Sequence, residues 1–138
     1  MKTLRLGEVA ESLPCDYGDE CVDGTPSFDV VKVSNIDGGG KLYGEFERRV
    51  FKKDQLTNLL VNEGELLVVK SSGSKANILS GKTAICDSTR ARRIVASNFL
   101  LRLRVNESVA FPRYIWDVLN SPRNLLKIDA SWQPEWRG

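Results

Sequence analysis

The 138-residue chain has 41% hydrophobic and 28% charged residues and a net charge of +2, values typical of one soluble globular domain with its own core. No stretch reaches the roughly 18 apolar residues of a membrane span, and the N-terminus lacks a signal-like apolar run, so we expect a cytoplasmic protein with no membrane contact. The absence of histidine excludes Ser-His and Cys-His nucleophiles and His-ligated metals.

The three cysteines, Cys15, Cys21 and Cys86, are irregularly spaced and odd in number. This pattern suits neither a disulfide framework nor a zinc site, so we expect reduced, structural thiols. We likewise expect no cofactor and no metal ion.

The first third of the chain predicts a helix and two strands. Residues 6–13 carry apolar side chains at helical spacing and precede Pro14, which predicts a short helix. Residues 28–36 are rich in Val and end at a run of three glycines, which predicts a strand followed by a flexible loop. Residues 42–51 alternate in part and predict a second strand.

The middle of the chain predicts a helix and two strands around a long loop. Residues 54–60 predict a short helix capped by Asp54. Residues 65–70 and 83–87 are apolar and β-prone, so they predict strands on either side of a loop of about a dozen residues. Loops of that length in a compact domain are usually functional or disordered.

Residues 97–105 give the clearest strand pattern. Its alternation places Phe99, Leu101, Leu103 and Val105 on one face, and Arg102 and Arg104 on the other.

The C-terminal part predicts two helices. One opens at Phe111-Pro112 and runs to about Asn120. Ser121 and Pro122 predict the N-cap and first turn of another, through about Ala130. Together the elements predict one domain over residues 1–138, a mixed α/β or α+β unit whose twisted, mostly antiparallel or mixed sheet is flanked by short helices.

Charge is unevenly distributed along the chain. Residues 1–31 have a net charge of −5, whereas residues 32–93 have a net charge of +5. Within the second block, residues 66–93 carry six basic side chains and one acidic side chain, Asp87. Such a concentration is typical of a polyanion-binding surface, and the alternative is a solvated basic rim.

The segment 76–83 fits a relaxed phosphate-loop pattern, in which four residues separate Ala76 from Gly81, Lys82 and Thr83. A phosphate loop needs a helix directly after this motif, because the helix N-terminus holds the anion. Residues 83–87 predict a strand instead, so we do not expect a nucleotide-hydrolysing enzyme. The pair Glu65 and Lys70 would point to opposite faces of its strand, which argues against a metal-dependent nuclease.

Several segments, in order, are similar to the target recognition domain of the DNA specificity subunit of type I restriction-modification systems. The similarity spans about residues 3–128. The segments are LGEVAE (6–11), VVKVSNIDGGG (30–40), NEGELLVVKSSGS (62–74), SGKTAIC (80–86), VASNFLLRLRV (95–105) and LNSP (119–122).

The resemblance implies a non-catalytic mixed α/β unit that reads one half of a bipartite double-stranded DNA target, mainly in the major groove. Methyl transfer and cleavage would belong to separate methyltransferase (modification) and restriction subunits. A complete specificity subunit resembles two such domains joined by long helices, for which this chain has no room. We therefore expect one recognition domain without its spacer, whether a fragment, a split subunit or a stand-alone homologue.

The expected DNA-binding residues fall in the serine-rich loop, in the RARR turn and after the glycine run. They are Lys41, Tyr43, Lys70, Ser72, Gly73, Ser74, Lys75, Arg90, Arg92 and Arg93. Their hydroxyls, backbone and cations suit phosphate and base-edge contacts. The alternatives are a self-satisfied serine turn, a solvated arginine turn and, for the whole chain, a protein-interaction or regulatory domain that retains the fold without binding DNA.

Overall fold

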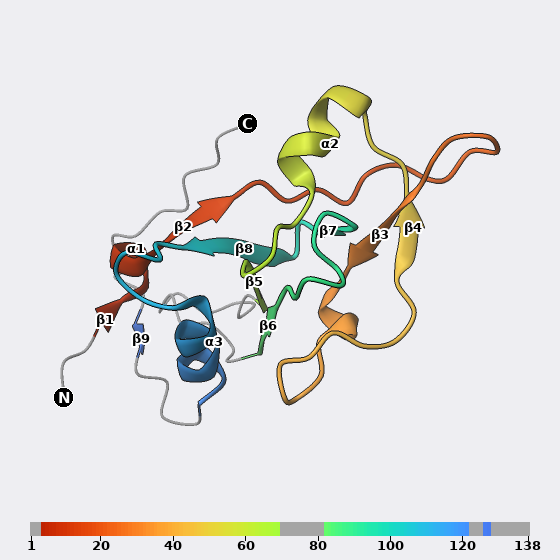
Figure 1. The fold of residues 1–138 in the computed structure, drawn as a ribbon. Coiled ribbons are helices and arrows are strands. Elements are labelled where there is room, and N and C mark those ends of the chain that lie inside the picture. The colour runs from red at the N-terminus through yellow and green to blue at the C-terminus, as the bar shows by residue number, and fades with distance from the viewer. Residues whose placement is uncertain (1–3, 70–81, 122–125, 128–138) are drawn as a thin grey trace.

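A four-stranded antiparallel sheet forms the centre of the molecule (Figure 1). The computed structural model of the protein describes residues 4–69, 82–121 and 126–127. Across the sheet the strands are, in order, β2 (Ala10–Leu13), β8 (Leu100–Val105), β5 (Leu66–Val69) and β6 (Thr83–Ile85). β6 is an edge strand.

A second sheet and a short terminal ladder make the architecture mixed. The second sheet has the order β4 (Glu47–Arg49), β3 (Phe28–Val31) and β7 (Ile94–Ala96), with β3 and β7 parallel. β1 (Leu4–Arg5) and β9 (Leu126–Lys127) also pair in parallel. The helices are α1 (Leu6–Val9), α2 (Lys53–Leu59) and α3 (Pro112–Asn120), with a 3₁₀ turn, η1, at Val33–Asn35.

The central sheet is buried on both faces. Leu66 and Val68 of β5 pack in one cluster with Ile115 of α3, whereas Leu67 joins the opposite cluster with Val31 of the second sheet. The order of layers is therefore helix α3, central sheet and second sheet. This is a small α+β domain with mixed sheets and few helices, as the sequence predicts. None of the helices in the described ranges is long and apolar enough to cross a bilayer.

Three predicted elements differ from the structure in type or extent. The predicted helix 6–13 stops at Val9, because the next four residues pair with β8 as β2. The predicted strand 42–51 is reduced to Glu47–Arg49. The carbonyls of Tyr43 and Glu45 accept hydrogen bonds from the Asn35 side-chain amide instead of from a neighbouring strand.

The predicted helix after residue 121 is also wrong in its described part. Ser121 is the C-cap of α3 rather than the N-cap of a new helix. Leu126–Lys127 form strand β9, which is stabilised by pairing with β1.

Smaller corrections concern the ends and faces of elements. β3 ends at Val31, five residues earlier than predicted. The N-cap of α2 is Lys52, whereas Asp54 lies in the first turn. Phe99 precedes β8 and is 64% exposed. Arg102 is only 2% exposed, because its guanidinium is enclosed by the carbonyls of Pro14, Asn58 and Leu60.

Candidate nucleic-acid interface

A pocket of about 390 Å³ opens beside the edge strand β6. Four chain segments meet there: the loop after η1, the end of β6, the turn that precedes β7, and α3. We call it the basic pocket, and its lining residues are Gly40, Lys41, Leu42, Ile85, Asp87, Thr89, Arg90, Arg113 and Trp116.

Three cations line the basic pocket, and no ion pair engages them within the described part of the chain. The Arg90 guanidinium carbon lies 4.7 Å from the centre of the Phe46 ring. The Arg113 guanidinium carbon lies 5.7 Å from the Trp116 ring centre. Such stacking orients a guanidinium without using its N–H donors. These donors, together with the Lys41 ammonium, remain available to an anion.

Asp87 is the one acidic side chain in the pocket lining, and its own turn uses its carboxylate. Its Oδ1 accepts hydrogen bonds from the Thr89 hydroxyl at 2.6 Å, the Thr89 N–H at 3.0 Å and the Arg90 N–H at 3.2 Å. The hydroxyl bond, aided by the two N–H groups and the nearby Arg90 charge, lowers the Asp87 pKa below its ordinary value. The carboxylate therefore stays ionised and stabilises the turn that carries Arg90.

Gly40 fixes the loop that carries Lys41. Its φ of +80° favours glycine, and a Cβ there would lie 2.5 Å from the Thr83 carbonyl oxygen and 2.6 Å from Asn120 Nδ2. Trp116 Nε1 donates to the Gly40 carbonyl at 3.1 Å. The backbone of this loop is therefore held tightly between β6 and α3.

Asn120 holds the other side of this junction. Its Oδ1 accepts from the Thr83 N–H, and its Nδ2 donates to the Thr83 carbonyl, both at 2.9 Å. Nδ2 also donates to the Trp116 carbonyl at 2.9 Å. The amide thus replaces a neighbouring strand at Thr83 and fastens the C-terminal end of α3 to the sheet edge.

The predicted DNA-binding residues are only partly brought together. Lys41 and Arg90 come from distant segments and line the same pocket. Tyr43 is 52% exposed and does not line it, while its N–H donates to the Asn35 carbonyl. Arg92 and Arg93 are exposed, as expected, but they too lie outside the lining.

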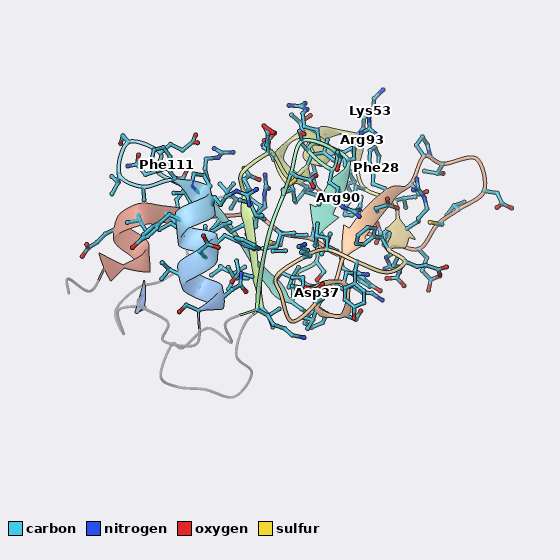
Figure 2. All side chains as sticks on the ribbon, turned by 60° about the horizontal axis from the view of Figure 1, so that its bottom comes forward. Phe28, Asp37, Lys53, Arg90, Arg93 and Phe111 are labelled. Atoms are coloured by element: carbon cyan, nitrogen blue, oxygen red, sulfur yellow. The ribbon has the colours of Figure 1, made fainter. Side chains whose placement is uncertain are left out.

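The RARR turn is anchored at its third residue. Arg92 has a φ of 61°, and its N–H donates to the Val61 carbonyl at 2.6 Å. Arg90 is half-buried rather than fully exposed, because it packs over Phe46. In Figure 2, Arg90 lies between Arg93 near the top and Asp37 near the bottom.

The serine-rich loop itself, with Lys70, Ser72, Gly73, Ser74 and Lys75, lies outside the described residues. Its flanks are described: the Val69 N–H donates to the Lys82 carbonyl at 2.9 Å, directly beside Thr83. The loop therefore leaves and rejoins the sheet next to the Gly40 junction. Residues 83–85 form a strand, as predicted, so no helix follows the Gly-Lys-Thr motif.

Sequence reasoning missed Arg113 and Trp116. The two residues lie three positions apart on α3, beside the buried stripe of Ile115, Val118 and Leu119. Residues three apart on a helix share a side, so a helical projection of the predicted helix would have placed these two together at the edge of its apolar face.

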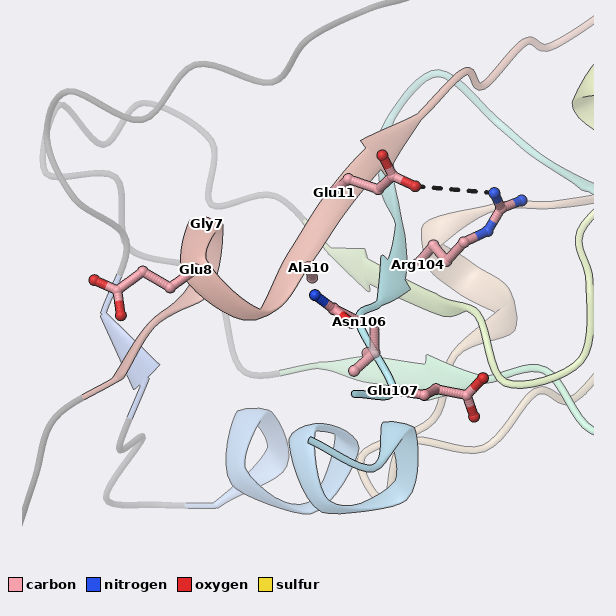
Figure 3. Close-up of a pocket in the computed structure, with 8 residues that line it drawn as sticks. Gly7, Glu8, Ala10, Glu11, Arg104, Asn106 and Glu107 are labelled. Atoms are coloured by element: carbon pink, nitrogen blue, oxygen red, sulfur yellow. Dashed lines mark ion pairs between the residues drawn. The ribbon is translucent and has the colours of Figure 1, made fainter. Parts of the chain in front are cut away.

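A second pocket, of about 480 Å³, has the opposite character (Figure 3). We call it the acidic pocket, because Glu8, Glu11 and Glu107 line it with a single cation, Arg104. Arg104 reaches Glu11 at 3.9 Å and the buried Glu65 carboxylate at 3.1 Å. In the described ranges no group of His, Cys, Asp or Glu side chains has the arrangement of a metal site.

Glu65 also pairs with Arg102 in the interior. Arg102 Nε donates to Glu65 Oε1 at 2.8 Å, and both side chains are almost fully buried. The remaining guanidinium donors reach the carbonyls of Pro14 at 3.2 Å, Asn58 at 2.8 Å and Leu60 at 2.8 Å. Two arginines thus occupy the Glu65 carboxylate, and Arg102 is a structural cross-link rather than a surface cation.

Comparison with protein-family models and with curated proteins finds no significant match to this chain.

Proposed function

We propose that the protein binds double-stranded DNA and reads one half of a bipartite target, as the recognition domain of a type I specificity subunit. The observation that supports this most directly is the basic pocket, where Lys41, Arg90 and Arg113 converge without an ion pair in the described part of the chain. The sequence resemblance supplies the class of polyanion and the biological setting. The domain itself is non-catalytic in this proposal.

Phosphate contacts explain how such a surface would bind. Arg and Lys side chains position a protein on the DNA backbone, and each neutralised phosphate releases counterions. Arg92 and Arg93 extend the same turn and add positive charge beyond the pocket. The serine-rich loop, anchored beside the pocket, would supply base-edge contacts. Its proposed contact residues are Lys70, Ser72, Gly73, Ser74 and Lys75.

Partners follow from the same proposal. Methyltransferase subunits and a restriction subunit would join through a spacer helix of the complete subunit. These subunits would perform the chemistry, so the domain would direct them without turning over a substrate itself.

The test is the salt dependence of duplex binding. We expect duplex affinity to fall steeply with salt, and Lys41→Ala, Arg90→Ala and Arg113→Ala each to lower the slope of log K against log salt by about one. Lys53→Ala is the matched control, because Lys53 is an exposed cation on α2 that does not line the pocket. Site selection from random duplexes then measures whether a sequence is preferred.

Two outcomes would contradict the proposal. Binding that is absent at low salt, in a protein shown to be folded, would favour the protein-interaction alternative. Equal losses of duplex affinity in the three pocket variants and in Lys53→Ala would mean that net charge, rather than the pocket, determines affinity.

A further inference from the structure

The edge of β6 carries backbone groups that the sheet does not use. The Val69 N–H donates to the Lys82 carbonyl and the Cys86 N–H to the Glu65 carbonyl, both at 2.9 Å. In an antiparallel ladder hydrogen-bonded pairs alternate, so the backbone groups of Thr83 and Ile85 point away from β5. Both residues therefore present an N–H and a C=O at the free edge.

The two edge positions differ in what covers them. The Asn120 amide satisfies both backbone groups of Thr83. No described residue pairs with the N–H or C=O of Ile85, which instead lines the basic pocket. Ile85, whose N–H has no partner among the described residues, thus lines the same pocket as three cations.

We propose that the basic pocket binds one phosphate group, with the Ile85 N–H donating to a phosphate oxygen and Lys41, Arg90 and Arg113 balancing its charge. In DNA this group is a backbone phosphodiester, and to that extent the inference rests on the proposed function. The Ile85 N–H is fixed by the strand, so it gives the phosphate a defined position that flexible side chains alone do not provide.

An extended acidic peptide is the other class of ligand for a strand edge beside cations. Peptide addition to a sheet edge uses a row of main-chain hydrogen bonds. Here only Ile85 is open, because Asn120 already occupies Thr83. A single residue is too short for a strand ladder, which favours the phosphate.

The first measurement is a titration of the wild-type chain with inorganic phosphate, monitored by NMR of the backbone amides. We expect the Ile85 amide resonance to shift saturably, while sodium chloride at equal ionic strength leaves it in place. A second titration with a short duplex should move the same resonance. An Ile85 amide that stays in place with phosphate overturns the proposal, and so does saturable binding of an acidic peptide without phosphate binding.

A pair of variants isolates the N–H. Ile85→Pro removes it at an edge position where proline is tolerated, whereas Ile85→Ala shortens the same side chain and keeps the N–H. We expect about a tenfold loss of phosphate affinity in Ile85→Pro, as for the loss of one charge-assisted hydrogen bond, and less than about a twofold loss in Ile85→Ala. Equal affinities in the two folded variants overturn the assignment. If Ile85→Pro does not fold, the wild-type amide shift decides.

The two proposals fail separately. If phosphate shifts the Ile85 amide resonance but the duplex does not bind, the phosphate site stands and the proposed DNA function is wrong. Duplex binding that leaves the Ile85 amide in place retains the DNA function and overturns the phosphate assignment.

Discussion

The basic pocket and the acidic pocket both contain arginine, yet only one of them offers it to a ligand. In the acidic pocket, Arg104 is engaged by Glu11 and by the buried Glu65. In the basic pocket, Arg90 and Arg113 lie against aromatic rings. The Asp87 carboxylate accepts hydrogen bonds from within its own turn, at Thr89 and Arg90. A charged side chain is therefore available to a ligand only where the fold leaves it without an ion-pair partner.

The strongest way to test this contrast is to remove the most deeply engaged cation. Arg102→Met would leave Arg104 as the one cation paired with Glu65 among the described residues. It would also leave the carbonyls of Pro14, Asn58 and Leu60 without their donor. We expect a loss of about 3–5 kcal/mol in the free energy of unfolding, because breaking a buried pair strands a buried charge. Urea denaturation measures it.

The matched control for that change is Arg113→Met on the exposed side of α3. A surface substitution of this kind should alter the free energy of unfolding by less than about 0.5 kcal/mol. Similar decreases in the free energy of unfolding in the two variants would contradict the distinction between engaged and available arginines.

An intermediate effect is expected at the junction that positions Lys41. Gly40→Ala combines an unfavourable φ of +80° with a Cβ contact of 2.5 Å to the Thr83 carbonyl oxygen. We expect a destabilisation of about 1–3 kcal/mol, typical of overpacking, and weaker duplex binding in the folded fraction. Gly38→Ala is the control, since nothing lies within 4 Å of its added Cβ. Thermal unfolding that is unchanged in Gly40→Ala would contradict the geometry.

The smallest effect concerns Asp87 and pH. Because its pKa is lowered in the folded protein, its contribution to stability is present above the ordinary aspartate pKa and is lost as pH falls through the folded pKa. Asp87→Asn should therefore flatten the acid side of the stability profile and, by removing the one acidic group of the pocket lining, raise duplex affinity by about twofold. Unfolding followed from pH 6 to pH 2 tests the first expectation. A profile that matches wild type would mean that the turn does not depend on the charge.

Local patterns in the sequence predict much of the fold. The apolar runs of β5 and β6 and the proline-initiated helix α3 appear where the periodicity places them. These elements carry their own signals, because buried strands are continuously apolar and proline suits the first helical turn.

Elements that depend on a distant partner were not predictable in the same way. Ala10–Leu13 continue a helical pattern but become β2 through pairing with β8. Arg102 alternates like a solvent-facing residue, yet the carbonyls of Pro14, Asn58 and Leu60 and the Glu65 carboxylate accept its hydrogen bonds in the interior. Local periodicity cannot predict that segments distant in the sequence will pair with a strand or bury one of its faces.

The candidate site was predictable only in part for a related reason. Arg90 and Lys41 were both expected at the interface, but their meeting depends on two contacts of α3. Trp116 donates to the Gly40 carbonyl, and Asn120 fastens the helix to Thr83 of β6. Arg113 enters from a helix outside that block. The pocket is a product of packing between segments, which composition along the chain does not reveal.

The Arg102 cross-link also has a kinetic consequence. Its acceptors at Pro14, Asn58 and Leu60 are separated from it by 88, 44 and 42 residues. Each contact closes a long chain loop. Topologies rich in such contacts fold slowly, because the chain loses conformational entropy on closing the loop before the contact contributes favourable free energy. The guanidinium finds all its acceptors only when the N-terminal segment, the end of α2 and β8 have assembled. We therefore expect these three parts to open together in hydrogen exchange, as one cooperative unit.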